Sequence, residues 1–242
     1  MAAKLESEYP DLFNFQAKDS FNWSLSASHT GDLIIVKNSC LDKDSKFNGF
    51  DQATDVFDAL AMQVEEDLVY QGSQNEYKTD ECQAIHLSQA NGWSAEWAIG
   101  KSFDEIHMRV PRIKEIIRDT SKIIKSIVEA PFPTERIGAV NFRTSSALNR
   151  HPEIPEHIRH VPFHHEKNPN LFLRFERQTV SGFKKESAFL FTIKTYITQI
   201  SPDMNKSKWE SFKLCLEQSS EKSNPHKFIE LNRIELEKWV DT

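Results

Sequence analysis

The sequence predicts an α+β protein in which an antiparallel sheet is flanked by helices. Apolar and polar residues alternate in Leu171–Thr179 and Ala188–Thr198, which is typical of strands, and a turn-forming Ser181-Gly182 lies between them. Elsewhere apolar residues recur at spacings of three and four, the period of an amphipathic helix. An antiparallel hairpin and several helices are therefore expected.

The first fifty residues are polar, with short apolar groups at Leu12–Phe15 and Leu33–Val36. The second group follows a Thr30-Gly31-Asp32 turn signal and is expected to be a strand. From Asp51 an apolar stripe predicts a helix that ends near Asp67.

Short strands are expected next, at Leu68–Tyr70 and, after a polar loop, at Cys82–Leu87. Beyond Pro111, apolar residues from Ile113 to Val128 predict a helix that ends before Pro131. A strand is expected at Arg136–Arg143.

The segment Leu148–Asn170 is rich in proline, histidine and charge, and we expect a long loop there. Two helices are predicted within 205–242, and they are too short to bury a core alone. We therefore expect one domain over 1–242, with extra helical segments at both ends.

Composition and charge exclude several classes of protein. With 30 Lys plus Arg against 36 Asp plus Glu, the net charge is −6, which argues against a nucleic-acid binder. Glycine-rich nucleotide motifs and the GxSxG nucleophile elbow are missing from the sequence. Cys40, Cys82 and Cys215 are an odd number without a CxxC pair, so a disulfide framework is not supported. Without a signal sequence or an apolar run of spanning length, we expect a cytoplasmic protein that is not in a membrane.

Five of the nine histidines fall in the 148–170 segment, and neutral imidazole is a good ligand for zinc, iron and copper. They are His151, His157, His160, His164 and His165. Their spacing fits no HExxH register, so a polar surface loop is the expected arrangement and a metal site is the alternative.

His107 lies among apolar neighbours before Pro111. Such a residue is usually a hydrogen-bonded core histidine. An axial iron ligand needs the same surroundings, however, because its imidazole must be fixed through its other ring nitrogen within an apolar pocket. Periodicity alone does not decide between the two.

A third candidate is the row Arg174, Glu176 and Gln178, which the two-residue period places on one face of a strand. Phe175, Arg177 and Thr179 share the other face. A solvated face is the usual explanation for such a row, and a polar cavity wall is the alternative. An arginine on a cavity wall suits a carboxylate, because its planar fork binds one bidentately.

Several short motifs share their order and approximate spacing with a known family. They are Glu66-Asp67-Leu68-Val69, Gly92-Trp93-Ser94, Ile99-Gly100-Lys101, Ile106-His107 with Val110-Pro111, Arg174-Phe175-Glu176-Arg177-Gln178-Thr179, and Phe191-Thr192-Ile193-Lys194-Thr195-Tyr196. Together these motifs, which span roughly 52–200, resemble the haem-binding alpha subunit of haem-dependent oxidative N-demethylases, also called dimethylamine monooxygenases.

The resemblance implies a PAS-like antiparallel sheet that holds one haem b. It also implies oxidation of a small secondary amine by O₂, with release of formaldehyde. Electrons from NAD(P)H would come through partner reductase subunits that carry FMN and an iron–sulfur cluster, which agrees with the missing nucleotide motifs. In such an enzyme the cofactor carries the chemistry, and the protein supplies ligation and orientation.

The resemblance also implies roles for individual residues. His107 would be the proximal iron ligand. Arg174 or Arg177, with Arg143, would pair with haem propionates, and Trp93 would pack near the haem edge. Glu176 or Gln178 would hold the substrate ammonium or relay protons to bound oxygen.

The chain departs from the family pattern at two places. No tryptophan follows Arg143, and the Gln89-Ala90-Asn91 stretch has no proline before the Gly92-Trp93 pair. A pocket altered there would accept a different amine, or would bind haem without demethylation. A haem-binding PAS-like sensor or carrier is thus the main alternative, and a mononuclear metal protein using the histidine loop is a third.

Overall fold

The computed structural model describes residues 1–48, 53–72, 80–108, 119–155, 161–218 and 226–240. Backbone contacts divide the chain into two compact units, Met1–Glu65 and Glu66–Thr242. Each unit contains an antiparallel sheet together with helices, which confirms the α+β class. Whether the two units behave as the single domain expected from the sequence stays a prediction.

The first unit is built on a four-stranded antiparallel meander in the order β1-β2-β3-β4. Its elements are α1 (Ala2–Glu8), β1 (Phe13–Ala17), β2 (Trp23–Ala27), β3 (Asp32–Lys37), β4 (Cys40–Leu41) and α2 (Val56–Ala61). The strand expected at Leu33–Val36 is confirmed within β3. Helices α1 and α2 agree with the expected N-terminal helical segment, and a sheet accompanies them because short stretches with a period of two, such as Leu25 and Ala27 in β2, pair with neighbouring strands and bury that face.

Helix α2 is shorter than the expected helix from Asp51 to Asp67. Asp55 caps its start, where the side chain accepts a hydrogen bond from the Asp58 N–H at 2.8 Å. Two residues after its end, the buried Gln63 donates from Nε2 to Asp32 Oδ2 at 2.9 Å. This bond ties Gln63 to the start of β3, and the chain leaves the helix there.

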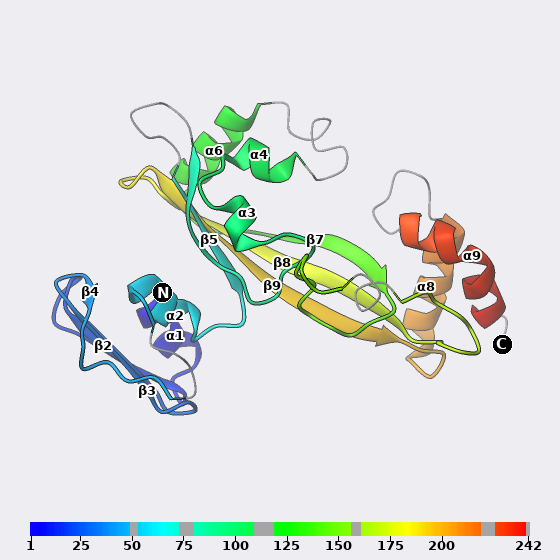
Figure 1. Ribbon diagram of the computed structural model, residues 1–242, viewed down its shortest axis with the longest axis horizontal. Coiled ribbons are helices and arrows are strands. Elements are labelled where there is room, and N and C mark those ends of the chain that lie inside the picture. The colour runs from blue at the N-terminus through cyan, green and yellow to red at the C-terminus, as the bar shows by residue number, and fades with distance from the viewer. Residues whose placement is uncertain (49–52, 73–79, 109–118, 156–160, 219–225, 241–242) are drawn as a thin grey trace. The chain divides into compact units, whose positions relative to one another are not determined.

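The second unit contains a five-stranded antiparallel sheet in the order β6-β5-β9-β8-β7 (Figure 1). The strands are β5 (Asp67–Gly72), β6 (Glu81–His86), β7 (Thr134–Arg143), β8 (Leu171–Phe183) and β9 (Ala188–Ile200). All the strands expected here are confirmed, including the hairpin. Its turn lies later than expected, at 184–187, because pairing of β8 with β9 continues without interruption to Phe183 and Ala188.

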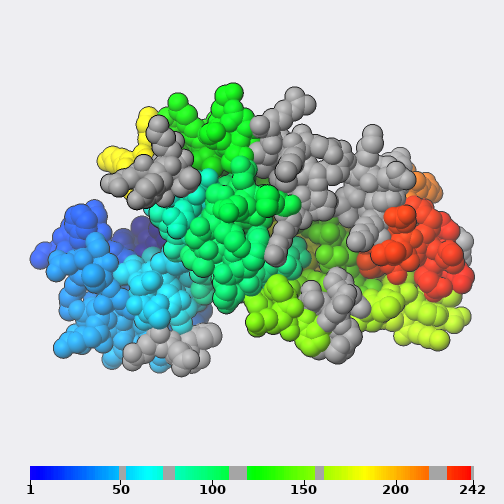
Figure 2. All heavy atoms as spheres, turned by 45° about the horizontal axis from the view of Figure 1, so that its top comes forward, coloured from blue at the N-terminus to red at the C-terminus, as the bar shows by residue number. Residues whose placement is uncertain are grey.

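Helices α3 (Ala95–Ala98), α4 (Phe103–His107) and α6 (Thr120–Glu129) connect β6 to β7. Phe103 of α4 packs with Ile124 and Val128 of α6 against Phe189 of β9. In the space-filling view, green side chains of this connection form a thick layer, and yellow atoms of the β8–β9 hairpin emerge at one end (Figure 2). The first part of the expected 113–128 helix, up to residue 118, lies outside the described residues.

The C-terminal helices α8 (Lys206–Gln218) and α9 (His226–Val240) confirm the two helices expected in 205–242. They pack against one end of the long strands (Figure 1). Aromatic side chains meet there: Phe142 of β7, Phe212 of α8 and Trp239 of α9 lie edge to face. Aromatic side chains therefore supply much of the core between the C-terminal helices and the end of the sheet.

Candidate functional site

The polar row on β8 is buried. Arg174, Glu176 and Gln178 are only 0%, 5% and 8% exposed, so the expected solvated face is wrong, and the alternative of a cavity wall stays a prediction. The reason is tertiary: neighbouring strands flank the row, and the segment 88–91 covers it. Arg177 lies on the opposite face with 41% of its side chain exposed, which confirms that the two arginines point to opposite sides.

Arg174 is the largest fully buried side chain among the described residues. Its Nη1 donates to Glu176 Oε1 at 2.6 Å, and its Nη2 donates to Thr195 Oγ1 at 2.9 Å and to the Gln89 carbonyl oxygen at 3.3 Å. The Nε of Arg174 is buried without a hydrogen-bond partner. A buried donor of this kind costs about 1–3 kcal/mol if it stays unpaired.

Glu176 is the centre of the network. In addition to Arg174, it accepts hydrogen bonds from Asn91 Nδ2 at 3.1 Å and from Gln178 Nε2 at 2.8 Å. The amide oxygen of Gln178 in turn accepts from Arg136 Nε at 2.8 Å. Because an ionised carboxylate has about four acceptor sites, Glu176 retains room for one further donor.

A second arginine, Arg143, is partly buried and lies near enough to Arg174 for the two charges to repel each other. Burial lowers the pKa of Arg143, and repulsion from the Arg174 charge lowers it further. Arg143 Nη1 donates to the Phe142 carbonyl oxygen at 3.2 Å, whereas its Nε, like that of Arg174, is buried without a partner. Two cations with unpaired donors, of which only Arg174 is paired with the Glu176 carboxylate, form a positive site that fits an anionic group.

Asp67 holds the covering segment in place. Its Oδ1 accepts from the backbone N–H groups of Ser88 at 2.8 Å and Gln89 at 2.7 Å, and also from Ser88 Oγ. Burial raises the pKa of Asp67, the hydrogen bonds oppose the rise, and the nearby Glu176 charge adds to it. The same segment then contacts Arg174 and Glu176 through Gln89 and Asn91.

His107 is the last residue of α4, whose start is fixed by a capping box between Ser102 and Glu105. The ring stacks on Phe103 with 3.9 Å between centroids, and Nδ1 lies 2.8 Å from the Phe103 carbonyl oxygen. Because a carbonyl only accepts, Nδ1 carries the proton and the lone pair is on Nε2. Burial lowers the pKa of His107, and the Arg136 charge adds to this effect, so the ring is neutral at neutral pH. A histidine held in this way is suited to ligate a metal through Nε2.

The remaining candidates lie at the margins of this network. Trp93 is half-buried, two residues after Asn91 and directly before Ser94, the N-cap of α3. Arg177 forms long ion pairs with Glu66 at 3.7 Å and Glu135 at 3.8 Å. Both residues are close in sequence to members of the network.

The histidine segment is only partly the expected polar loop. His164 and His165 converge on Glu235 of α9 and are partly buried, whereas His151 lies near Glu96 and Glu153. His157 and His160 lie outside the described residues.

Sequence reasoning missed four members of the network: Arg136, Gln89, Asn91 and Thr195. Arg136 lies opposite Gln178 only because β7 contains a bulge between Gly138 and Asn141, where Ala139 has a φ of 47°. The hydrophobic periodicity of the sequence does not predict such a bulge. The departures from the family pattern at Gln89–Asn91 and at Arg143 were a usable signal, because both now border the network.

The fold and the site define a class: an α+β protein with a buried network of arginine and carboxylate on a sheet face, and a neutral histidine on a helix packed over that face. The cationic network fits the carboxylates of a cofactor, and the neutral histidine fits its metal.

The chain belongs to the family of haem-dependent oxidative N-demethylases, alpha subunit-like, whose model matches residues 1–228. No curated protein matches the sequence. The family description points to haem as the cofactor and to one subunit of a larger enzyme. Among the described helices, none has the length and hydropathy required to cross a membrane.

Proposed function

We propose that the chain is the haem-binding subunit of a monooxygenase that removes a methyl group from a small secondary amine such as dimethylamine and releases it as formaldehyde. The observation that carries this proposal is the buried row of Arg174, Glu176 and Gln178, with unpaired Nε donors on Arg174 and Arg143. Bound haem b would supply the oxygen chemistry, and the five-stranded sheet would be the PAS-like scaffold.

In this proposal His107 holds the iron through Nε2. Its ring is kept neutral by burial and is oriented by the Phe103 carbonyl and by stacking on the Phe103 ring. Asp80 fixes the start of the same helix, since its Oδ2 accepts from the Phe103 N–H and from Gln71 Nε2 of β5. The imidazole is thus tied to the sheet and presented in one tautomer.

Arg143 and Arg174 would bind the propionates. Each has a buried donor without a partner, and a carboxylate would satisfy both donors and reduce the repulsion between the two cations. Arg177 is a weaker candidate because it is partly exposed and already faces Glu66 and Glu135. Trp93 would pack near the haem edge.

Glu176 would hold the substrate ammonium through its remaining acceptor site, and Gln178 would fix the orientation of that carboxylate. A substrate cation here is paired with a carboxylate whose other bonds are already formed, so little reorganisation is needed. Electrons would reach the subunit from NAD(P)H through reductase subunits with FMN and an iron–sulfur cluster.

The test is haem titration followed by an assay for formaldehyde. The haem-loaded chain, with a chemical reductant, O₂ and dimethylamine, should release formaldehyde well above a control with haem alone. A Soret band without product would instead support the sensor or carrier. Absence of a Soret band would contradict both functions.

Two variants, each with a matched control, locate the site in the same titration. His107→Ala should shift or abolish the Soret band, whereas the double variant His164→Gln/His165→Gln should leave it unchanged. Arg143→Gln should weaken haem affinity by about tenfold without lowering the stability of the haem-free chain, and Arg177→Gln is the matched control. If the double histidine variant alone alters the band, the assignment of His107 is wrong.

A further inference from the structure

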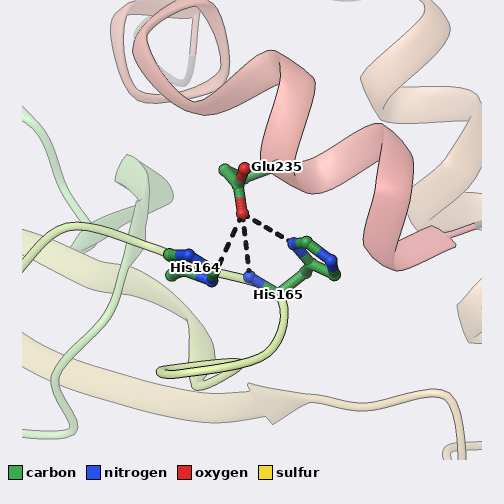
Figure 3. A group of neighbouring side chains, drawn as sticks. All are labelled: His164, His165 and Glu235. Atoms are coloured by element: carbon green, nitrogen blue, oxygen red, sulfur yellow. Dashed lines mark hydrogen bonds and ion pairs between the residues drawn. The ribbon is translucent and has the colours of Figure 1, made fainter.

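We propose that His164, His165 and Glu235 form a zinc site that ties the loop 161–168 to helix α9. One ligand atom from each residue can be chosen so that all three atoms lie within 4.8 Å of one another. Figure 3 shows the two imidazoles from the loop and the carboxylate from the helix directed toward one another. Glu235 lies beyond residue 228, where the family match ends, and none of the three residues has a role in the proposed haem function.

Packing places the three groups before any metal binds. Phe163 is 3% exposed, and its ring lies edge to face with Trp239 at 5.4 Å, which anchors the loop on α9. Glu235 is one helical turn before Trp239 and therefore shares its face. His164 and Asn168 exchange both backbone hydrogen bonds, which closes the loop into a tight turn.

The distances suit a metal of zinc's size. Glu235 Oε2 lies 3.5 Å from His164 Nδ1 and 2.7 Å from His165 Nδ1. Zinc bonds of about 2.0–2.2 Å in tetrahedral geometry separate neighbouring ligand atoms by about 3.4 Å. The first distance already fits, and the second must open by about 0.7 Å as zinc replaces the His165 hydrogen bond.

The surrounding groups are compatible with coordination. Backbone N–H groups of Glu166 and Lys167 donate long hydrogen bonds to His164 Nδ1 at 3.3 and 3.4 Å, and zinc would have to replace both donors at the lone pair of this nitrogen. When Nδ1 of His165 binds zinc, the ring keeps its proton on Nε2, and Glu166 Oε1 faces this N–H at 3.7 Å. Lys238 contacts the other oxygen of Glu235, Oε1, at 3.3 Å and leaves Oε2 to the site.

Two nitrogens and one carboxylate oxygen, with no thiolate, are the ligand set of many zinc sites in which water takes the fourth position. The three side chains are 19–35% exposed, so zinc can enter without unfolding the chain. The predicted consequence is mechanical: the metal would join the loop to the helix and hold both against the sheet end.

The test is competition for zinc chloride between the full chain and a chromophoric chelator. We expect one zinc per chain, bound at least tenfold more weakly by His164→Gln, His165→Gln and Glu235→Gln. Glu237→Gln on the same helix and His151→Gln on the same long segment are matched controls and should bind as the wild type does. Equal losses in the controls, or no stoichiometric binding by the wild type, would overturn the site.

X-ray absorption of the zinc-loaded wild type provides a measurement that needs no variant. A first shell of nitrogen and oxygen with imidazole scattering supports the site, and a sulfur ligand refutes it. Because neither measurement requires haem or demethylation, failure of this proposal is distinct from failure of the proposed function.

Discussion

At the scale of single residues, the main feature is that charge is buried where an exposed strand face is the ordinary expectation. Arg174 forms three hydrogen bonds, and Glu176 accepts three. Removing one partner of such a pair is expected to cost about 3–5 kcal/mol, because it leaves an uncompensated charge. Burial of such charges is explained either by a structural role or by the binding of a ligand. The unpaired Nε donors of Arg174 and Arg143 favour a ligand.

Asp67 gives a pH-dependent prediction at this scale. Because its pKa is raised in the folded state, the native chain holds the proton more tightly, and stability falls as pH rises from the unfolded value of 3.8 through the raised pKa. Asp67→Asn keeps Oδ1 and removes the charge. The variant should therefore gain stability relative to the wild type as pH rises from 3 to 7, where a difference of one in pKa is worth about 1.4 kcal/mol.

Urea unfolding at several pH values measures the effect. Ser88→Ala, which removes one donor to the carboxylate, should enlarge the loss of stability with pH. A difference between Asp67→Asn and the wild type that stays constant across this range would show that Asp67 titrates as it does in the unfolded chain.

At the scale of elements, helix α6 lies directly against strand β8. A Cβ atom added at Gly182 would lie 2.1 Å from the Ile127 carbonyl oxygen and 2.7 Å from that of Val128. These carbonyl oxygens belong to the helix backbone and cannot rotate away from an added Cβ atom as a flexible side chain can. Helix α6 would therefore have to move. Ile124 and Val128 of the same helix form the small core over Phe189.

Gly182→Ala should accordingly destabilise the chain by about 1–3 kcal/mol. Ser181→Ala, whose side chain points to the other face of β8, is the matched control and should change stability by less than about 0.5 kcal/mol. Denaturant unfolding followed by far-UV circular dichroism compares them. Equal stabilities of the two variants would contradict the close packing of α6.

At the scale of the whole molecule, the chain contains two compact units, and the family match spans both from residue 1 to 228. All the proposed haem contacts lie in Glu66–Thr242. We propose that the units nevertheless unfold as one domain, as the sequence predicts, because a single family model matches residues from both of them.

Leu25→Ala tests this proposal from the first unit, where Leu25 is fully buried. Loss of that side chain should cost about 2–5 kcal/mol. Calorimetry of the full chain should show one transition, shifted as a whole to lower temperature. Two transitions, of which only one moves, would show independent units; Leu231→Ala, at a residue that is 74% exposed, is the control.

The sequence by itself determined the α+β class, the long hairpin and the two C-terminal helices, because periods of two and three to four are local properties of the chain. It also placed Arg174, Glu176 and Gln178 on one face. Only the tertiary structure decided that this face is buried, since burial depends on segment 88–91 and on strand register. The same holds for Arg136, which a bulge aligns with Gln178, and for Glu235, which packing of Phe163 on Trp239 brings to His164 and His165 across seventy residues. Contacts of this kind join distant parts of the chain, and no local pattern in the sequence specifies them.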